Sequence, residues 1–184
     1  MLIRRNGREA KYRDPKGYRG KLEWDLERLA DVLRLSKEEA RDYFRDGRRS
    51  GFLVEKGILR KNPMLKAAPE NMIYDVQNGE ERWEVRTITS NGINFRPSVD
   101  IGAGRKFNKT RFEQKLQCVT GFIVCDVSTF PVVPYWSILS RIIAEWHHEK
   151  TISKGKTSYK KAIRLINGLD GQDQDSGQRQ KDGS

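Results

Sequence analysis

The chain has 184 residues, and its 36 lysines and arginines against 25 aspartates and glutamates give a formal net charge of +11. Hydrophobic residues make up 36% of the chain and include four Trp, six Tyr and seven Phe, which excludes a wholly disordered protein. No run of 18 apolar residues occurs, which excludes a membrane span, and no export signal is recognisable near the N-terminus. We therefore expect a cytoplasmic protein with one ordinary domain, or one domain with a small appendage, and no membrane partner.

The positive charge is concentrated toward the two ends of the part that is expected to fold. Residues 1–62 carry a net charge of +7 and residues 141–168 carry +5, whereas residues 63–140 carry +1 and residues 169–184 carry −2. A basic chain of this size is typical of nucleic-acid binding, because cationic side chains displace counterions from phosphates. The alternatives are an RNA-binding or ribosome-associated protein, and charge that serves solubility alone.

The N-terminal third predicts an arm followed by helices. Residues 1–20 contain few apolar side chains and predict a basic flexible arm. Residues 21–62 predict a helical region, because apolar residues recur at helical spacing and Ser36 with Glu39 forms a capping-box pattern that starts a second helix. Residues 51–61 are expected to form a short extended segment with a turn.

Two short helices followed by an extended pair are typical of a helix-turn-helix with a wing. Any helical hairpin packed on a sheet would give the same pattern, so this second interpretation stays open. In the winged-helix interpretation, the side chains of this region that contact DNA are Arg41, Arg45, Arg48 and Arg49.

A meander of three short strands is predicted in the middle of the chain. Runs of β-type residues at 72–76, 82–89 and 93–95 are separated by Asn78-Gly79 and Asn91-Gly92. Asn-Gly between two extended runs favours a tight turn, so we expect three antiparallel neighbours.

The rest of the core is expected to alternate helices with one further strand. The elements predicted beyond the meander are a helix at 108–119, a strand at 121–127, a buried helix at 135–148 and a last helix at 157–166. Residues 63–168 thus predict an α/β fold in which a central mixed sheet, the meander plus one strand, is flanked by helices. The polar residues 169–184 predict a disordered tail.

Two carboxylates come together on the predicted meander. Asp75 lies in its first strand and Glu84 in its second, where a period of two places Glu84 and Arg86 on one face. A hairpin through Asn78-Gly79 can set Asp75 beside Glu84, and two such carboxylates can hold Mg²⁺ together with a phosphate. The ion would polarise a scissile phosphate and supply a hydroxide nucleophile. The alternative interpretation is an exposed cross-strand ion pair with no catalytic role.

This arrangement resembles the PD-(D/E)XK nuclease superfamily, and the short chain resembles a small type II restriction endonuclease. The resemblance covers residues 72–127 and rests on Asp75, on Glu84-Val85-Arg86 in a β-meander, and on the helix and strand that follow. It implies that Asp75 and Glu84 bind the metal ion, and that a lysine two residues after the glutamate positions or deprotonates water.

Arg86 departs from the family pattern, because it stands where the family has this lysine; Tyr74 also stands where the family often has proline. An arginine is charged at all working pH values and is a poor general base, but its guanidinium can stabilise phosphate charge by a two-point contact. Three alternatives follow. Arg86 acts electrostatically, a lysine from elsewhere such as Lys115 on the next helix takes the role, or the site is inactive.

A basic loop with two glycines follows the meander. Gly102 and Gly104 allow a close backbone approach, and cationic residues follow at the start of the predicted helix. We expect a DNA-contact loop whose contact residues are Ser98, Arg105, Lys106 and Lys109. The alternative is a flexible turn.

Together these patterns predict a Mg²⁺-dependent endonuclease that cuts double-stranded DNA at a specific sequence. We expect a homodimer, because two strands require two active sites. The alternatives are a non-catalytic DNA-binding protein that uses the N-terminal helix-turn-helix, and an RNA-binding or ribosome-associated protein. Cys118 and Cys125 lie in apolar segments, which favours buried thiols over a disulfide or a metal pair.

Overall fold

The computed structural model describes residues 17–175, so most of the predicted arm and the end of the predicted tail lie outside the described residues. The strands are β1 (Arg19–Glu23), β2 (Lys66–Ala67), β3 (Val76–Asn78), β4 (Glu81–Ile88), β5 (Ile93–Asn94), β6 (Gly121–Asp126), β7 (Val132–Leu139) and β8 (Lys156–Thr157). The α-helices are α1 (Leu26–Leu33), α2 (Lys37–Arg45), α3 (Gly47–Lys61), α4 (Lys109–Cys118), α5 (Ser140–His148) and α6 (Tyr159–Asp175). Two short 3-10 helices cover Ser98–Asp100 and Val127–Thr129.

Six strands form one mixed sheet in the order β1-β7-β6-β4-β3-β2. The central pair, β4 and β6, is parallel, and all other neighbours are antiparallel. A parallel pair needs a long crossover connection, and α4 lies in this one. β5 and β8 form a separate two-stranded antiparallel sheet.

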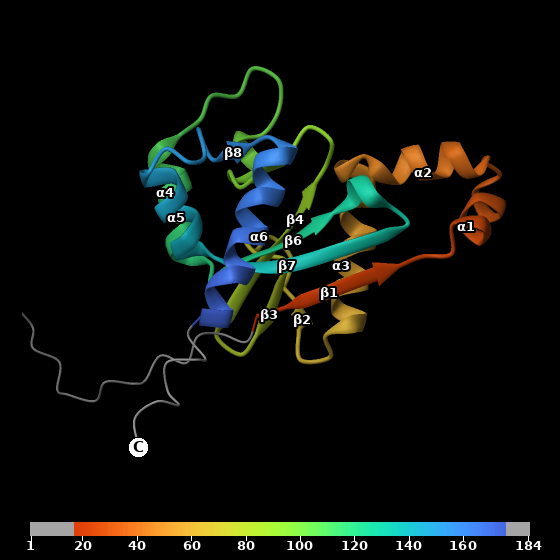
Figure 1. The fold of residues 1–184 in the computed structure, drawn as a ribbon, viewed down its shortest axis with the longest axis horizontal. Coiled ribbons are helices and arrows are strands. Elements are labelled where there is room, and N and C mark those ends of the chain that lie inside the picture. The colour runs from red at the N-terminus through yellow and green to blue at the C-terminus, as the bar shows by residue number, and fades with distance from the viewer. Residues whose placement is uncertain (1–16, 176–184) are drawn as a thin grey trace, which may run out of the picture.

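Helices cover both faces of the six-stranded sheet, so the molecule has three layers (Figure 1). α3 packs on one face, where its Ile58 belongs to a core cluster with Ile123 and Cys125 of β6. α4, α5 and α6 pack on the other face around Phe122 and Val124. All residues of β6 are buried, as expected for a central strand with helices on both sides. The predicted α/β class with a helix-flanked mixed sheet is confirmed.

Local sequence signals account for the starts of several elements. The Ser36 hydroxyl accepts a hydrogen bond from the Glu39 amide and the Glu39 carboxylate accepts one from the Ser36 amide, so the predicted capping box begins α2. Asp46 and Asn108 cap α3 and α4 through their side chains. The predicted turn at Asn78-Gly79 joins β3 to β4.

The predicted wing is wrong. Residues 51–61, which were expected to be extended, belong to α3, where Ser50, Val54 and Ile58 recur every four residues and are buried. Each glycine in the helix costs about 1 kcal/mol relative to alanine, and burial of this face against the sheet outweighs that cost. Residues 21–62 therefore contain most of β1 and three helices, without the β-wing of a winged helix. Their DNA-binding role stays a prediction.

The predicted helix at 135–148 is wrong in its first part. Residues up to Leu139 form strand β7, and only Ser140–His148 are helical. Tyr135 and Ile138 are buried within β7. A continuous apolar run of this kind cannot be assigned to helix or strand from its periodicity alone.

Strand pairing and several boundaries also differ from the prediction: β3 begins only at Val76, the last residue of the expected strand 72–76, so Asp75 lies just before it. β5, the expected third strand of the meander, pairs with β8, and β2 is the third antiparallel neighbour instead. Residues 19 and 20, predicted in the arm, belong to β1, which pairs with β7. α6 continues to Asp175 and thus into the predicted tail.

Within residues 17–175, no helix has the length and apolar character that crossing a membrane requires.

Candidate active site

The β3–β4 hairpin brings Asp75 and Glu84 together. Val76 pairs with Trp83 in antiparallel register, and the Asp75 amide donates to the Trp83 carbonyl at 3.0 Å. Continuing this register places Asp75 opposite Glu84. The Asp75 Oδ2 atom accepts a hydrogen bond from the Val85 amide at 2.7 Å, which holds this carboxylate against β4.

Glu84 is buried and has two cationic partners. Glu84 is only 4% exposed. Its carboxylate forms ion pairs with Arg86 of β4 and Lys115 of α4. Burial raises the pKa of Glu84; the two cations oppose this shift, and the charge of Asp75 adds to it. The interpretation as an exposed cross-strand ion pair is therefore wrong for Glu84.

Lys115 reaches this carboxylate from a helix on the sheet. α4 buries Phe112 and Leu116 in the core, and Lys115, next to Leu116 and one turn after Phe112, is also buried at 8% exposure. Burial lowers the pKa of Lys115, the charge of Glu84 opposes this shift, and the charge of Arg86 adds to it. The neutral amine is thus easier to form at Lys115 than at a surface lysine.

Glu55 is a third acid near this site, and the sequence analysis missed it. It lies on α3 and is partly buried, and burial together with the charge of Asp75 raises its pKa. Its local sequence does not separate it from other helical acids. Only the packing of α3 against the sheet brings it near Asp75.

A cavity of about 430 Å³ opens beside the charged groups. Asp75, Glu84 and Lys115 line it together with Cys118 of α4. Cys118 is exposed, so the expectation of a buried thiol is wrong for this residue, whereas Cys125 is buried as predicted. The cavity gives a ligand access to both carboxylates and to the lysine.

Arg86 lines a larger groove and contacts two residues of this cavity, Glu84 and Ser98. Its Nη2 atom donates to the Arg96 carbonyl at 2.8 Å and to the Ser98 hydroxyl at 3.4 Å, beside the ion pair with Glu84. Its Nε is buried and has no hydrogen-bond partner among the described residues. Ser98 lines the cavity and Arg86 lines the groove, so the two depressions meet at this guanidinium.

The acids of the cavity suit a hard cation. Mg²⁺ is commonly held by one or two carboxylates plus phosphate oxygens and water. Asp75 and Glu84 supply two carboxylates to one cavity. No cluster of three or more His, Cys, Asp or Glu side chains fit for a metal ion occurs in the described part of the chain. The two carboxylates are a donor pair that could hold Mg²⁺ only together with phosphate oxygens and water.

The larger groove contains only some of the predicted DNA-contact residues. It has a volume of about 1310 Å³, and Arg45 and Arg48 at the α2–α3 joint line it. Arg41 and Arg49 are not among its lining residues. Arg49 instead lies 3.6 Å from the carboxylate of Asp46.

The predicted DNA-contact loop has a depression of its own. Arg105, Lys106 and Lys109 line a space of about 480 Å³. Arg105 Nη1 donates to the carbonyl oxygens of Ser98 and Val99 at 3.2 and 2.8 Å, so this guanidinium also holds its own loop in place. These three cationic residues remain predicted contacts.

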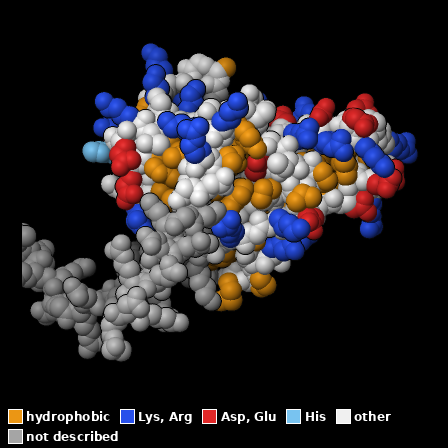
Figure 2. All heavy atoms as spheres, viewed as in Figure 1, with side chains coloured by type: hydrophobic (Ala, Val, Ile, Leu, Met, Phe, Trp, Pro, Cys, Tyr) orange, Lys and Arg blue, Asp and Glu red, His pale blue; other side chains and the backbone are white. Residues whose placement is uncertain are grey.

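The far side of the groove carries cations that the sequence analysis did not single out. Lys150, Lys156 and Lys161 line it. The net charge of +5 on residues 141–168 was the available signal. Figure 2 shows Lys and Arg side chains gathered in the upper left, around β8, whereas over α1 and α2 they are mixed with Asp and Glu.

Comparison with models of protein families, with curated proteins and with solved structures gives no match for this chain. The interpretation of the site therefore depends on its own geometry: two carboxylates, a buried lysine and an arginine beside a basic groove.

Proposed function

We propose that the protein is a Mg²⁺-dependent endonuclease that cuts double-stranded DNA, with its active site in the cavity lined by Asp75, Glu84 and Lys115. The observation that carries the proposal is the ion pair between the buried Lys115 ammonium and the buried Glu84 carboxylate, next to Asp75. Burying both charges has a desolvation cost that a purely structural role could avoid with apolar side chains. Such costly groups are often found at functional sites.

The four side chains divide the chemistry among them. Asp75 and Glu84 would hold the metal ion, which when bound polarises the scissile phosphate and lowers the pKa of water. Lys115 in its neutral form would accept a proton from the attacking water, because its lowered pKa makes that form accessible. Arg86 would donate to a phosphate oxygen and stabilise the added negative charge.

The order of elements supports the resemblance to PD-(D/E)XK nucleases. An antiparallel meander of β2, β3 and β4 is followed by α4 and by β6, which lies parallel to β4. In this proposal, Lys115 on α4 takes the place of the family lysine, and Arg86 acts electrostatically. A homodimer with two-fold symmetry would place one site on each DNA strand.

Removing the carboxylate charges tests this proposal. Plasmid DNA is incubated with the protein and Mg²⁺, and cleavage by the wild type is compared with that by Asp75→Asn and Glu84→Gln. We expect each variant to lose about 100-fold or more in rate, because a metal ligand becomes neutral. Glu80→Gln, at an exposed position of the same hairpin, should cut at the wild-type rate.

Two results would contradict the nuclease. One is the absence of cleavage by the folded wild type with Mg²⁺ or Mn²⁺; the other is unchanged cleavage by both variants. Retained DNA binding without cleavage would instead favour a non-catalytic DNA-binding protein, in which the ion pair between Glu84 and Lys115 ties α4 to β4.

A further inference from the structure

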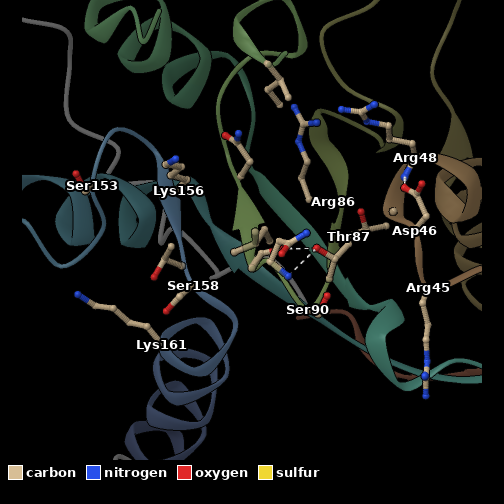
Figure 3. Close-up of a pocket in the computed structure, with 18 of the residues that line it drawn as sticks. Arg45, Asp46, Arg48, Arg86, Thr87, Ser90, Ser153, Lys156, Ser158 and Lys161 are labelled. Atoms are coloured by element: carbon tan, nitrogen blue, oxygen red, sulfur yellow. Dashed lines mark hydrogen bonds between the residues drawn. The ribbon is translucent and has the colours of Figure 1, made fainter. Parts of the chain in front are cut away.

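The groove of about 1310 Å³ is assembled from three parts of the chain that are distant in sequence. One wall is the α2–α3 joint, the floor is the end of β4 with the turn after it, and the other wall is the segment 150–161. Figure 3 shows Arg45 and Arg48 at one side, Arg86 between, and Lys156 at the other side.

Both walls of the groove carry positive charge. Arg45 and Arg48 lie on one wall, and Lys150, Lys156 and Lys161 lie on the other. All five residues are exposed, and none of the three lysines forms an ion pair with a described acid. Acidic side chains of the lining occur on the α2–α3 side alone, at Asp42 and Asp46. The lysine wall is therefore the stronger attractor for a polyanion.

The turn at the floor of the groove lies directly against β8, the strand that carries Lys156 of the lysine-bearing wall. Gly92 has a φ of 98°, and a Cβ atom there would lie 2.0 Å from the Thr157 carbonyl oxygen, so only glycine fits. This close approach places Ser90 and Asn91, both exposed, in the groove beside β8. Hydroxyl and amide groups can bind sugar, phosphate or base edges.

Arg86 links the floor of the groove to the proposed active site. It lines the groove, and its guanidinium contacts Glu84 and Ser98 of the adjoining cavity. The buried Arg86 Nε–H has no acceptor among the described residues. A phosphate at this end of the groove would supply one and would lie next to the cavity.

We propose that this groove binds the backbone of duplex DNA, and that Lys150, Lys156 and Lys161 form one of its two phosphate-binding walls. Cations on two opposed walls match the two rows of phosphates of a duplex, whereas a single strand presents one row. The inference deepens the proposed function, since it locates the substrate relative to the cavity. Binding itself needs neither metal nor cleavage.

Binding measured without metal tests the wall separately from catalysis. Fluorescence anisotropy in EDTA follows a labelled DNA duplex of about two helical turns, with a single strand and an RNA duplex of equal length for comparison. The test variant is Lys156→Ala with Lys161→Ala. Its matched control is Lys154→Ala with Lys160→Ala, which removes the same charge from exposed positions of the same segment outside the groove lining.

We expect the groove variant to lose about 10-fold or more in duplex affinity, with the salt slope of the binding constant reduced by about 2, because two phosphate contacts are removed. The control should keep the wild-type slope. Equal losses in both variants, no loss in the groove variant, or tighter binding of the single strand or RNA duplex than of DNA would overturn the inference.

The two proposals fail in different ways. If duplex binding depends on Lys156 and Lys161 but Mg²⁺ supports no cleavage, the nuclease proposal is contradicted and the DNA-binding role of the groove is supported. If the groove variant cuts DNA at the wild-type rate, the DNA-binding role of the groove is contradicted and the nuclease proposal is supported. Circular dichroism spectra of both variants confirm that the comparison is between folded proteins.

Discussion

At the residue scale, the Lys115–Glu84 pair is the most informative contact of the molecule. Burial favours the neutral form of each group, so it lowers the pKa of Lys115 and raises the pKa of Glu84. The opposite charge of the partner works against both shifts. An ion or phosphate that enters the cavity changes this balance, because it adds charge within reach of both side chains.

The lowered pKa of Lys115 predicts how cleavage depends on pH. As pH rises, the neutral amine becomes populated at Lys115 at a lower pH than at an exposed lysine, so the cleavage rate should rise with pH through the pKa of Lys115. Lys115→Arg keeps a cation beside Glu84, but an arginine cannot lose its proton. We therefore expect this variant to cut DNA about 100-fold more slowly and without the pH dependence of the wild type. Single-turnover cleavage measured across a pH series checks both.

Lys66→Arg, an exposed position on β2, serves as the control for the arginine exchange and should keep the wild-type pH profile. Duplex binding in EDTA should be unchanged in Lys115→Arg. If Lys115→Arg cuts DNA with wild-type rate and profile, Lys115 does not accept the proton.

The two cysteines should differ sharply in reactivity. Cys118 is exposed at the edge of the cavity, whereas Cys125 is wholly buried in β6, and burial raises the pKa of its thiol. N-ethylmaleimide should therefore modify one thiol in the native protein and block cleavage by filling the cavity mouth. Mass spectrometry and a cleavage assay measure the two effects.

Cys118→Ser should cut DNA at a rate close to that of the wild type and should resist the reagent. Full cleavage activity after complete modification of Cys118 would show that this cavity is not where the substrate reacts.

The residues that form the candidate site were easier to predict from the sequence than the residues that pack around them. Asp75 and Glu84 follow from a hairpin that two local signals specify, the β-type runs and Asn78-Gly79, and Lys115 was among the alternatives for the lysine. The contribution of Glu55 could not be predicted, because it depends on how α3 lies on the sheet.

At the element scale, α3 and β7 show where local patterns fail. α3 contains glycines and a Lys-Gly pair that favour a turn, yet Val54 and Ile58 gain more from burial than these glycines cost. In β7, the neighbouring strands β1 and β6 decide the conformation of an apolar run. Both outcomes depend on tertiary contacts, whereas the capping box at Ser36 needs only local residues and was predicted correctly.

Strand β1 should stabilise the whole sheet through one side chain. Leu22 is 2% exposed and belongs to the core cluster on the α3 face. We expect Leu22→Ala to lower the free energy of unfolding by about 2–5 kcal/mol, because a cavity replaces its side chain. Urea unfolding followed by tryptophan fluorescence measures this change.

Lys21→Ala is the matched control on the same strand. Lys21 is exposed and pairs with Glu23 at 2.7 Å on the surface, so its removal should change the free energy of unfolding by less than about 0.5 kcal/mol. Equal unfolding midpoints for the wild type and Leu22→Ala would mean that β1 does not pack on this core in solution.

At the scale of the whole molecule, two segments that are distant in sequence meet across the sheet. The largest excess of positive charge lies in residues 1–62 and 141–168, and residues 42–48 and 150–161 within these regions supply the two walls of the groove. Charge counting along the sequence located these regions. That they face each other across β4 could not be predicted, because it depends on the strand order of the sheet.

The pairing of β1 with β7 has a consequence for how the chain folds during synthesis. Arg19 lies opposite Trp136, so the first described strand has no partner until the ribosome has made most of the protein. β2, β3 and β4 can pair earlier, because their contacts are local, whereas closing so long a segment has an entropic cost that slows the last step. Strand β1 therefore joins the edge of the sheet, and Leu22 becomes buried, late in folding. The β3–β4 hairpin beside Asp75 and Glu84 can form before that.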